Sequence, residues 1–134
     1  MLTRFHLLLN FDFTHLGFTV FAGVLFPDGD GARELSRTCS PKLRVLRMDV
    51  TKVDDIECVV NAIRISGQHL YAIVNNAGIG FGAFADLGKL DLDDYRRVLD
   101  VNLLGVIRVT RACIPLLRET RGRIVNVESL AGKK

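Results

Sequence analysis

Cysteine and histidine are scarce in this sequence, and neither shows a spacing typical of metal ligands. The three cysteines are an odd number and lie far apart: Cys39, Cys58 and Cys113. The three histidines are equally scattered: His6, His15 and His69. Both patterns argue against a disulfide framework and against a zinc site. We expect free, mostly buried thiols in a reducing compartment.

Long apolar runs are also absent. No stretch reaches the ~18 residues that a membrane-spanning helix requires. Residues 1–9 contain an arginine and three consecutive leucines, but Asn10 and Asp12 end this stretch before it is long enough for a signal peptide. The sequence therefore predicts no membrane span, and a secretory leader is the weaker interpretation of residues 1–9. We expect a cytoplasmic location.

Charge of one sign is not concentrated anywhere in the chain. The 134 residues carry a net charge of +3, with 25% charged and 49% hydrophobic residues. The basic residues are scattered and are not interleaved with aromatic ones, which disfavours a nucleic-acid interface. The length suits one soluble globular domain and is too short for two.

Short apolar runs alternate with segments of helical periodicity. In order, we expect a strand at 18–25, a helix at 32–38, a strand at 43–48, a helix from an N-cap at Thr51 to about residue 66, a strand at 70–75, a helix at 91–118 and a strand at 124–127. Strands that alternate with helices imply a parallel sheet with helices on both faces. The fold class is therefore α/β, a doubly wound parallel sheet.

Polar residues stand at or just past the ends of three expected strands: Asp49, Asn75 and Ser129. In doubly wound sheets, ligands bind outside the carboxyl ends of the strands. Topology alone therefore makes these residues candidates for one ligand site.

The most informative stretch is Asn75-Asn76-Ala77-Gly78, directly behind an apolar strand. Glycine allows close backbone approach, and amides supply both donors and acceptors, which suits a flat polar ligand. Together with Asn102 in the following long helix, and with residues 122–129, this stretch resembles the middle of a short-chain dehydrogenase/reductase. Residues 17–23 and 46–51 narrow the resemblance to the branch of retinol, 17β-hydroxysteroid and 3-hydroxybutyrate dehydrogenases. The resemblance covers residues 17–132 and implies one partial NAD(P)-binding Rossmann domain over 1–134.

The resemblance implies hydride transfer between a nicotinamide cofactor and an alcohol or ketone, such as a retinoid or steroid. By resemblance, Ser129 hydrogen-bonds the substrate oxygen and helps to stabilise alkoxide-like charge. Asn102 holds a water in the proton relay. The sequence departs from the family at Glu128, where a serine is usual. Relatives with an N-terminal anchor make attachment to the endoplasmic reticulum membrane the alternative location.

The resemblance also assigns cofactor contacts to Asp49, Val50, Asn75, Ala77 and Gly78. Asp49 would accept from the adenine amino group, the Val50 backbone would contact the ring, and Asn75 and Gly78 would lie against the adenine-ribose region. We expect NAD, with NADP as the alternative. The reason is that two acids beyond the first strand, at positions 28 and 30, would repel a 2′-phosphate.

Each of these residues also has an ordinary interpretation. Asp49 could interact with a helix dipole, Ser129 could be a cap, and Asn102 could satisfy a bent backbone near Gly105. Residues 78–83 fit G-x-G-x-x-A, the phosphate loop of a different class of nucleotide-binding protein, although no helix opens directly behind them.

Two family signatures are missing from the printed sequence. The first glycine is Gly17, so no Thr-Gly-x-x-x-Gly-x-Gly motif precedes it, and neither Tyr71 nor Tyr95 is followed by a lysine four positions on. We therefore expect an inactive fragment without the first strand and the C-terminal part of the domain. The alternative is a non-catalytic chain that associates with a full-length relative.

The missing first strand has a consequence for the sheet. The eight residues at 10–17 are too few for a parallel crossover, so residues 4–16 read as a remnant of the first helix. The sheet should then split into two pairs of strands. The 91–118 helix is more apolar than one sheet face can bury, which predicts a homo- or heterodimer through it.

Overall fold

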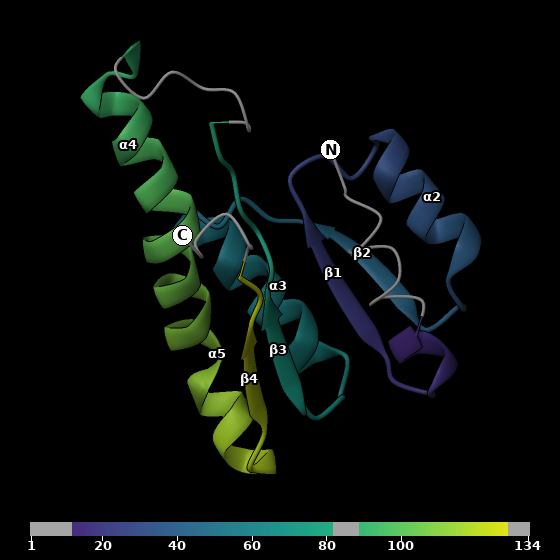
Figure 1. Ribbon diagram of the computed structural model, residues 1–134. Coiled ribbons are helices and arrows are strands. Elements are labelled where there is room, and N and C mark those ends of the chain that lie inside the picture. Colours follow the sequence, from purple (N-terminus) through teal and green to yellow (C-terminus); the bar gives the residue numbers. More distant parts are fainter. Residues whose placement is uncertain (1–11, 82–88, 129–134) are drawn as a thin grey trace. The chain divides into compact units, whose positions relative to one another are not determined.

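The computed structural model describes residues 12–81 and 89–128 (Figure 1). The chain divides into two compact units, residues 1–68 and 69–134, and each is described by itself. Both units contain a pair of parallel strands connected through helix, which gives an α/β architecture. Ser129 and residues 82–88 lie outside the described residues.

The first unit is built on two parallel strands. Its elements are β1 (Val20–Val24), α2 (Asp30–Thr38), β2 (Leu43–Arg47) and α3 (Val53–Ile65). The register runs from Val20 opposite Leu43 to Val24 opposite Arg47. Helix α3 contacts both strands because its apolar residues recur at helical spacing and form one buried face: Ile56, Val59, Val60 and Ile63.

The second unit has a helical segment that changes type along its length. Its elements are β3 (Ala72–Asn75), α4 (Leu92–Leu99), the π-helix η2 (Asp100–Gly105), α5 (Val106–Thr120) and β4 (Arg123–Asn126). Strands β3 and β4 are parallel, from Ala72 opposite Arg123 to Asn75 opposite Asn126. Helix α5 contacts both strands and buries Cys113 and Leu117, whereas α4 buries no residue.

The split of the sheet into two strand pairs is confirmed among the described residues. Residues 12–15 are helical, as expected of the described part of the 4–16 segment. The expected long helix over 91–118 is present as a continuous helical run from Leu92 to Thr120, but its middle part is the π-helix η2, which the sequence did not predict.

Two smaller expectations were wrong. Lys52, not Thr51, is the N-cap of α3, because the Thr51 amide and hydroxyl both donate to Asp49. The three cysteines are free as predicted, but only Cys113 is buried and Cys58 is exposed.

Within the described ranges, no helix is both long and apolar enough to cross a bilayer. Those ranges also hold no group of histidine, cysteine and acidic residues that could bind a metal.

Candidate functional site

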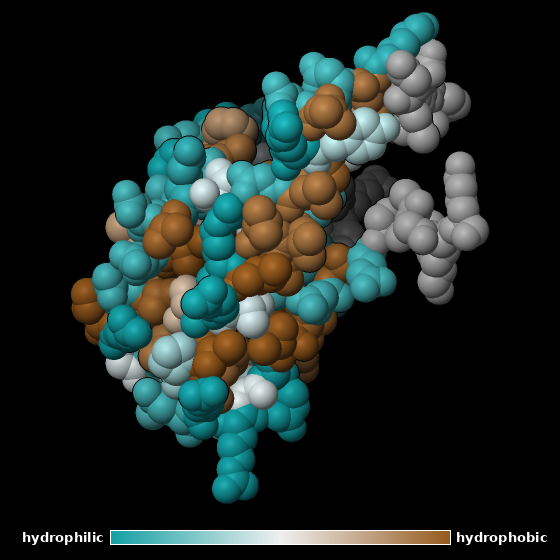
Figure 2. All heavy atoms as spheres, turned by 90° about the vertical axis from the view of Figure 1, so that its left-hand side faces the viewer, coloured by the Kyte–Doolittle hydropathy of each residue, from teal (hydrophilic) through white to brown (hydrophobic). Residues whose placement is uncertain are grey.

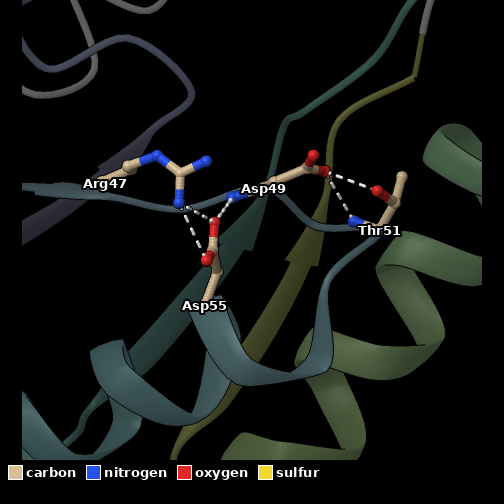
Figure 3. A network of polar contacts seen from close by, with 4 residues as sticks. All are labelled: Arg47, Asp49, Thr51 and Asp55. Atoms are coloured by element: carbon tan, nitrogen blue, oxygen red, sulfur yellow. Dashed lines mark hydrogen bonds and ion pairs between the residues drawn. The ribbon is translucent and has the colours of Figure 1, made fainter.

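A polar network surrounds the end of β2 in the first unit (Figure 3). Asp49, half-buried, accepts two hydrogen bonds at Oδ1, from the Thr51 amide at 2.9 Å and from the Thr51 hydroxyl at 2.7 Å. This bond from a side chain to the backbone two residues on is an Asx turn. It fixes the Asp49 carboxylate at the carboxyl end of the strand.

A second carboxylate supports the same turn. Asp55, in the first turn of α3, accepts the Asp49 backbone N–H at 2.9 Å, and Arg47 Nη1 donates to both Asp55 oxygens at 3.0 and 2.9 Å (Figure 3). The Asp55 side chain is only 18% exposed. The sequence interpretation missed this residue. The available signal was an acid in the first turn of a helix, which commonly only complements the helix dipole.

The network leaves one acceptor open. Both Thr51 bonds end on Asp49 Oδ1. Among the residues that the structure describes, no donor forms a hydrogen bond with Asp49 Oδ2. The pKa of Asp49 is lowered by the Thr51 backbone and side-chain hydrogen bonds, with smaller help from Lys52 and Arg47 and against the opposing effect of burial. Asp49 is therefore an ionised acceptor at neutral pH, suited to a ligand that donates a hydrogen bond.

The lowered pKa predicts how stability responds to acid. Such a carboxyl contributes stability that is fully present above its unfolded-state pKa, about 3.9, and is lost as pH falls through the lower folded value. Asp49→Asn should therefore lose less stability than the wild type between neutral pH and about pH 3. Thr51→Val should be intermediate, because the backbone donor remains. Urea midpoints followed by circular dichroism test this, and equal acid sensitivity of wild type and Asp49→Asn would contradict it.

In the second unit, Asn75 ends β3 with a buried amide. Its Nδ2 donates to Thr110 Oγ1 on α5 at 3.1 Å and to Asn126 Oδ1 on β4 at 2.9 Å. The backbone carbonyl oxygen of Asn75 accepts from the Val127 backbone amide at 2.9 Å. The Asn75 side chain thus links both strands and the helix. Both hydrogen-bond donors of Asn75 Nδ2 are therefore used within the protein.

The loop behind β3 is tied to the π-helix by Asn102. Asn102 Oδ1 accepts from the Ile79 amide at 2.9 Å, and Asn102 Nδ2 donates to the Ile79 carbonyl oxygen at 2.8 Å. The amide thus pairs with one backbone unit much as a neighbouring strand would. The Asn102 side chain therefore has its hydrogen-bond partner in the loop and not in the helix near Gly105.

Ala77 and Gly78 lie exposed on this loop. A Cβ added to Gly78 would meet Asn102 Oδ1 at 3.6 Å, an ordinary contact. Packing within the protein therefore does not require a glycine at this position. The open backbone is compatible with close approach of a flat ligand.

The sequence profile described as short chain dehydrogenase matches residues 13–134. This chain belongs to the short-chain dehydrogenase family. It is 48% identical over 120 residues to human 17-beta-hydroxysteroid dehydrogenase type 2, and the aligned residues cover 87% of this chain and 30% of that protein. It is 39% identical over 123 residues to mitochondrial D-beta-hydroxybutyrate dehydrogenase of Bos taurus, covering 87% and 35%. The chain thus spans about a third of the length of these curated relatives.

A solved structure shows the same fold. The 3-ketoacyl-(acyl-carrier-protein) reductase of Brucella melitensis, complexed with NADH, aligns with a TM-score of 0.83 and 26% identity over 96% of this chain and 55% of that one. The predicted family and its Rossmann-type α/β fold are therefore confirmed. Short-chain dehydrogenases bind a nicotinamide cofactor and act on small alcohols or ketones.

The predicted site residues of this family member fall into two groups. Asp49 and Val50 lie in the first unit, and Asn75, Ala77, Gly78 and Asn102 lie in the second. Within the second unit, the structure brings Asn102 to the loop that carries Gly78. Ser129, the remaining candidate, lies outside the described residues. The individual roles of all these residues stay predictions.

Proposed function

We propose that this chain forms part of a dehydrogenase that uses NAD to oxidise a secondary alcohol of a steroid or a similar apolar molecule. The observation that carries the proposal is the pair of hydrogen bonds between the Asn102 side chain and the Ile79 backbone. They fix the loop directly behind Asn75-Asn76-Ala77-Gly78, the segment that carries the family resemblance. The 48% identity to a 17-beta-hydroxysteroid dehydrogenase supports the steroid class.

Each unit, taken by itself, offers groups suited to the cofactor. Asp49 Oδ2 offers an ionised acceptor to the adenine amino group, and the Val50 backbone follows it. The exposed backbone of Ala77 and Gly78 leaves room for the adenine-ribose region, with Asn75 bracing the strand behind it. NAD is favoured over NADP because Arg33 is engaged by Asp30 at 2.7 Å, while Asp28 adds negative charge. When bound, the nicotinamide accepts or donates the hydride.

Two residues would serve the substrate. Ser129 would donate a hydrogen bond to the substrate oxygen as negative charge develops there. Asn102 would hold the relay water. Asn102 Oδ1 and Nδ2 each already form one hydrogen bond with Ile79. The water would therefore bind to the second lone pair of Oδ1, to the second N–H of Nδ2 or to the backbone of η2.

The printed sequence contains no Tyr-x-x-x-Lys pair to transfer the proton. We therefore propose that residues 1–134 alone are inactive, and the test must supply that pair from a relative. Residues 13–134 should replace the matched segment of human 17-beta-hydroxysteroid dehydrogenase type 2, followed by assay of NAD-dependent oxidation of a 17β-hydroxysteroid.

We expect the chimaera to be active. Asn102→Leu should lower its turnover by about a hundredfold with a smaller loss of NAD affinity, because acid–base relays contribute factors of this size. Gly78→Ala should instead raise the KM for NAD, since the added methyl fits the protein but occupies the space proposed for the cofactor. A folded but inactive chimaera would refute the proposal. Equal losses of NAD affinity and turnover in Asn102→Leu would reduce that residue to a structural role.

A second candidate function is association with a full-length relative. Large apolar side chains are exposed along α4, η2 and the start of α5: Leu92, Leu99, Leu103, Leu104 and Ile107. Figure 2 faces the side on which α4 and α5 lie and shows hydrophobic side chains open to solvent there. A chain that co-purifies with the human relative, while the chimaera shows no turnover, would favour this function.

A further inference from the structure

We infer that Arg108 is a positioning residue: by binding Asp100 across the π-helix η2, it holds the Asn102 side chain on the Ile79 backbone. Arg108 lies on α5, and Asp100, eight positions earlier, is the first residue of η2. Arg108 Nη2 lies 2.6 Å from Asp100 Oδ1, and Arg108 Nη1 donates to the Asp100 carbonyl oxygen at 3.2 Å. One guanidinium thus holds both the side chain and the backbone of Asp100.

Helix geometry links this contact to the π-helix. Neighbours on the surface of an α-helix are three or four residues apart, and two α-helical turns span about seven residues. A π segment, with its i→i+5 hydrogen bonds, adds about one residue to its turn. With a π turn between them, residue i+8 therefore returns close to the face of residue i. The Arg108–Asp100 contact and the π form of η2 support each other.

The surroundings favour this ion pair over a second pair on the same helical stretch, Arg96–Asp93. The Arg108 and Asp100 side chains are 28% and 41% exposed. The Arg96–Asp93 pair on α4 is 73% and 77% exposed, with a similar distance of 2.6 Å. Partial burial reduces screening by water, whereas exposed pairs contribute little. Arg96–Asp93 is therefore a matched control for the chemistry without the π-spanning geometry.

The contact bears on Asn102 because of what anchors each end of the helical stretch. Helix α5 is fixed by the buried Cys113 and Leu117, whereas α4 buries no residue. Arg108 therefore extends the hold of α5 to the first residue of η2, two positions before Asn102. Without it, η2 is free to rearrange, and the Asn102 amide loses its alignment with Ile79. The role of Arg108 in holding Asn102 does not depend on the proposed function; only an effect of Arg108 on turnover would rest on it.

Amide hydrogen exchange on the whole 134-residue chain tests the inference without any activity assay. In Arg108→Gln, the Ile79 amide, which donates to Asn102 Oδ1, should exchange about fivefold faster. The Arg123 amide, which donates to the Tyr71 carbonyl oxygen at 2.9 Å, serves as the internal reference and should change little. Arg96→Gln should leave both amides unchanged. Arg108→Lys should be intermediate, because an ammonium lacks the planar two-point geometry.

The outcomes separate the inference from its alternatives. An unchanged Ile79 amide in Arg108→Gln would overturn it. An equal rise at Ile79 and Arg123 would also overturn it, since that would report a general loss of stability in the unit. The double variant Asp100→Asn/Arg108→Gln should expose Ile79 no more than Arg108→Gln alone, as expected of a pair that acts together. Because turnover is not measured, failure of the proposed function would leave this result intact.

Discussion

Gly122→Ala should lower the free energy of unfolding of the second unit by about 2–3 kcal/mol, the upper part of the range of about 1–3 kcal/mol for overpacking. A Cβ at this position would lie 2.6 Å from the Tyr71 carbonyl oxygen, 2.7 Å from Leu117 Cδ2 and 3.0 Å from Thr120 Oγ1. The Tyr71 oxygen is backbone and cannot move away as a flexible side chain would. The methyl would also strain the neighbouring bond from the Arg123 amide to Tyr71 O, the first link between β4 and the β3 side.

The chain offers a spectroscopic probe and a control for this measurement. It has no tryptophan, and both tyrosines, Tyr71 and Tyr95, belong to the second unit, so tyrosine fluorescence in urea follows that unit. Gly80→Ala is the matched control, because no described atom lies within 4 Å of its added Cβ. Equal urea midpoints for the two variants would show that the contact at Gly122 does not matter to the unit.

Asn75→Leu should destabilise the same unit by about 2–3 kcal/mol. The side chain is 8% exposed, and its Nδ2 satisfies Thr110 Oγ1 and Asn126 Oδ1 together. Leucine has a similar size but leaves both acceptors without that donor, and an unsatisfied buried polar group costs about 1–3 kcal/mol.

Thr110→Val separates the two bonds of Asn75. It removes one acceptor and leaves the bond to Asn126 in place, so it should cost only about 1 kcal/mol. The double variant with Asn75→Leu should then be less than additive, because the two side chains share a hydrogen bond. Additive losses in tyrosine-monitored urea unfolding would show that Asn75 and Thr110 stabilise the unit independently.

The sequence predicted the order of elements well, because apolar runs and helical periodicity are local signals. Both parallel pairs and the face of α3 around Ile56 follow from them. The π-helix did not follow, since one additional residue in a turn barely alters the apolar pattern of residues 91–118. The N-cap at Thr51 was wrong because the Thr51 amide and hydroxyl both donate to the Asp49 carboxylate in the turn before α3, and Lys52 takes the N-cap position.

The site was predictable in residue types but not in connections. Asn75 and Asn102 could be selected because polar amides stand where apolar residues would be expected. Their partners could not, because Thr110 and Ile79 become neighbours only after folding. Asp55 was missed for the same reason, since its bond to the Asp49 amide closes across a turn.

Each strand pair, taken by itself, has two outer edges. Along each outer edge, no other described strand takes the backbone N–H and C=O groups, and such edges are templates for another strand. The case is clearest for β4, because Ile124 and Val125 are also 47% and 46% exposed. Parallel strands normally lie buried on both faces. Addition of a strand along β4 would therefore satisfy its backbone groups and shield its apolar side chains at the same time.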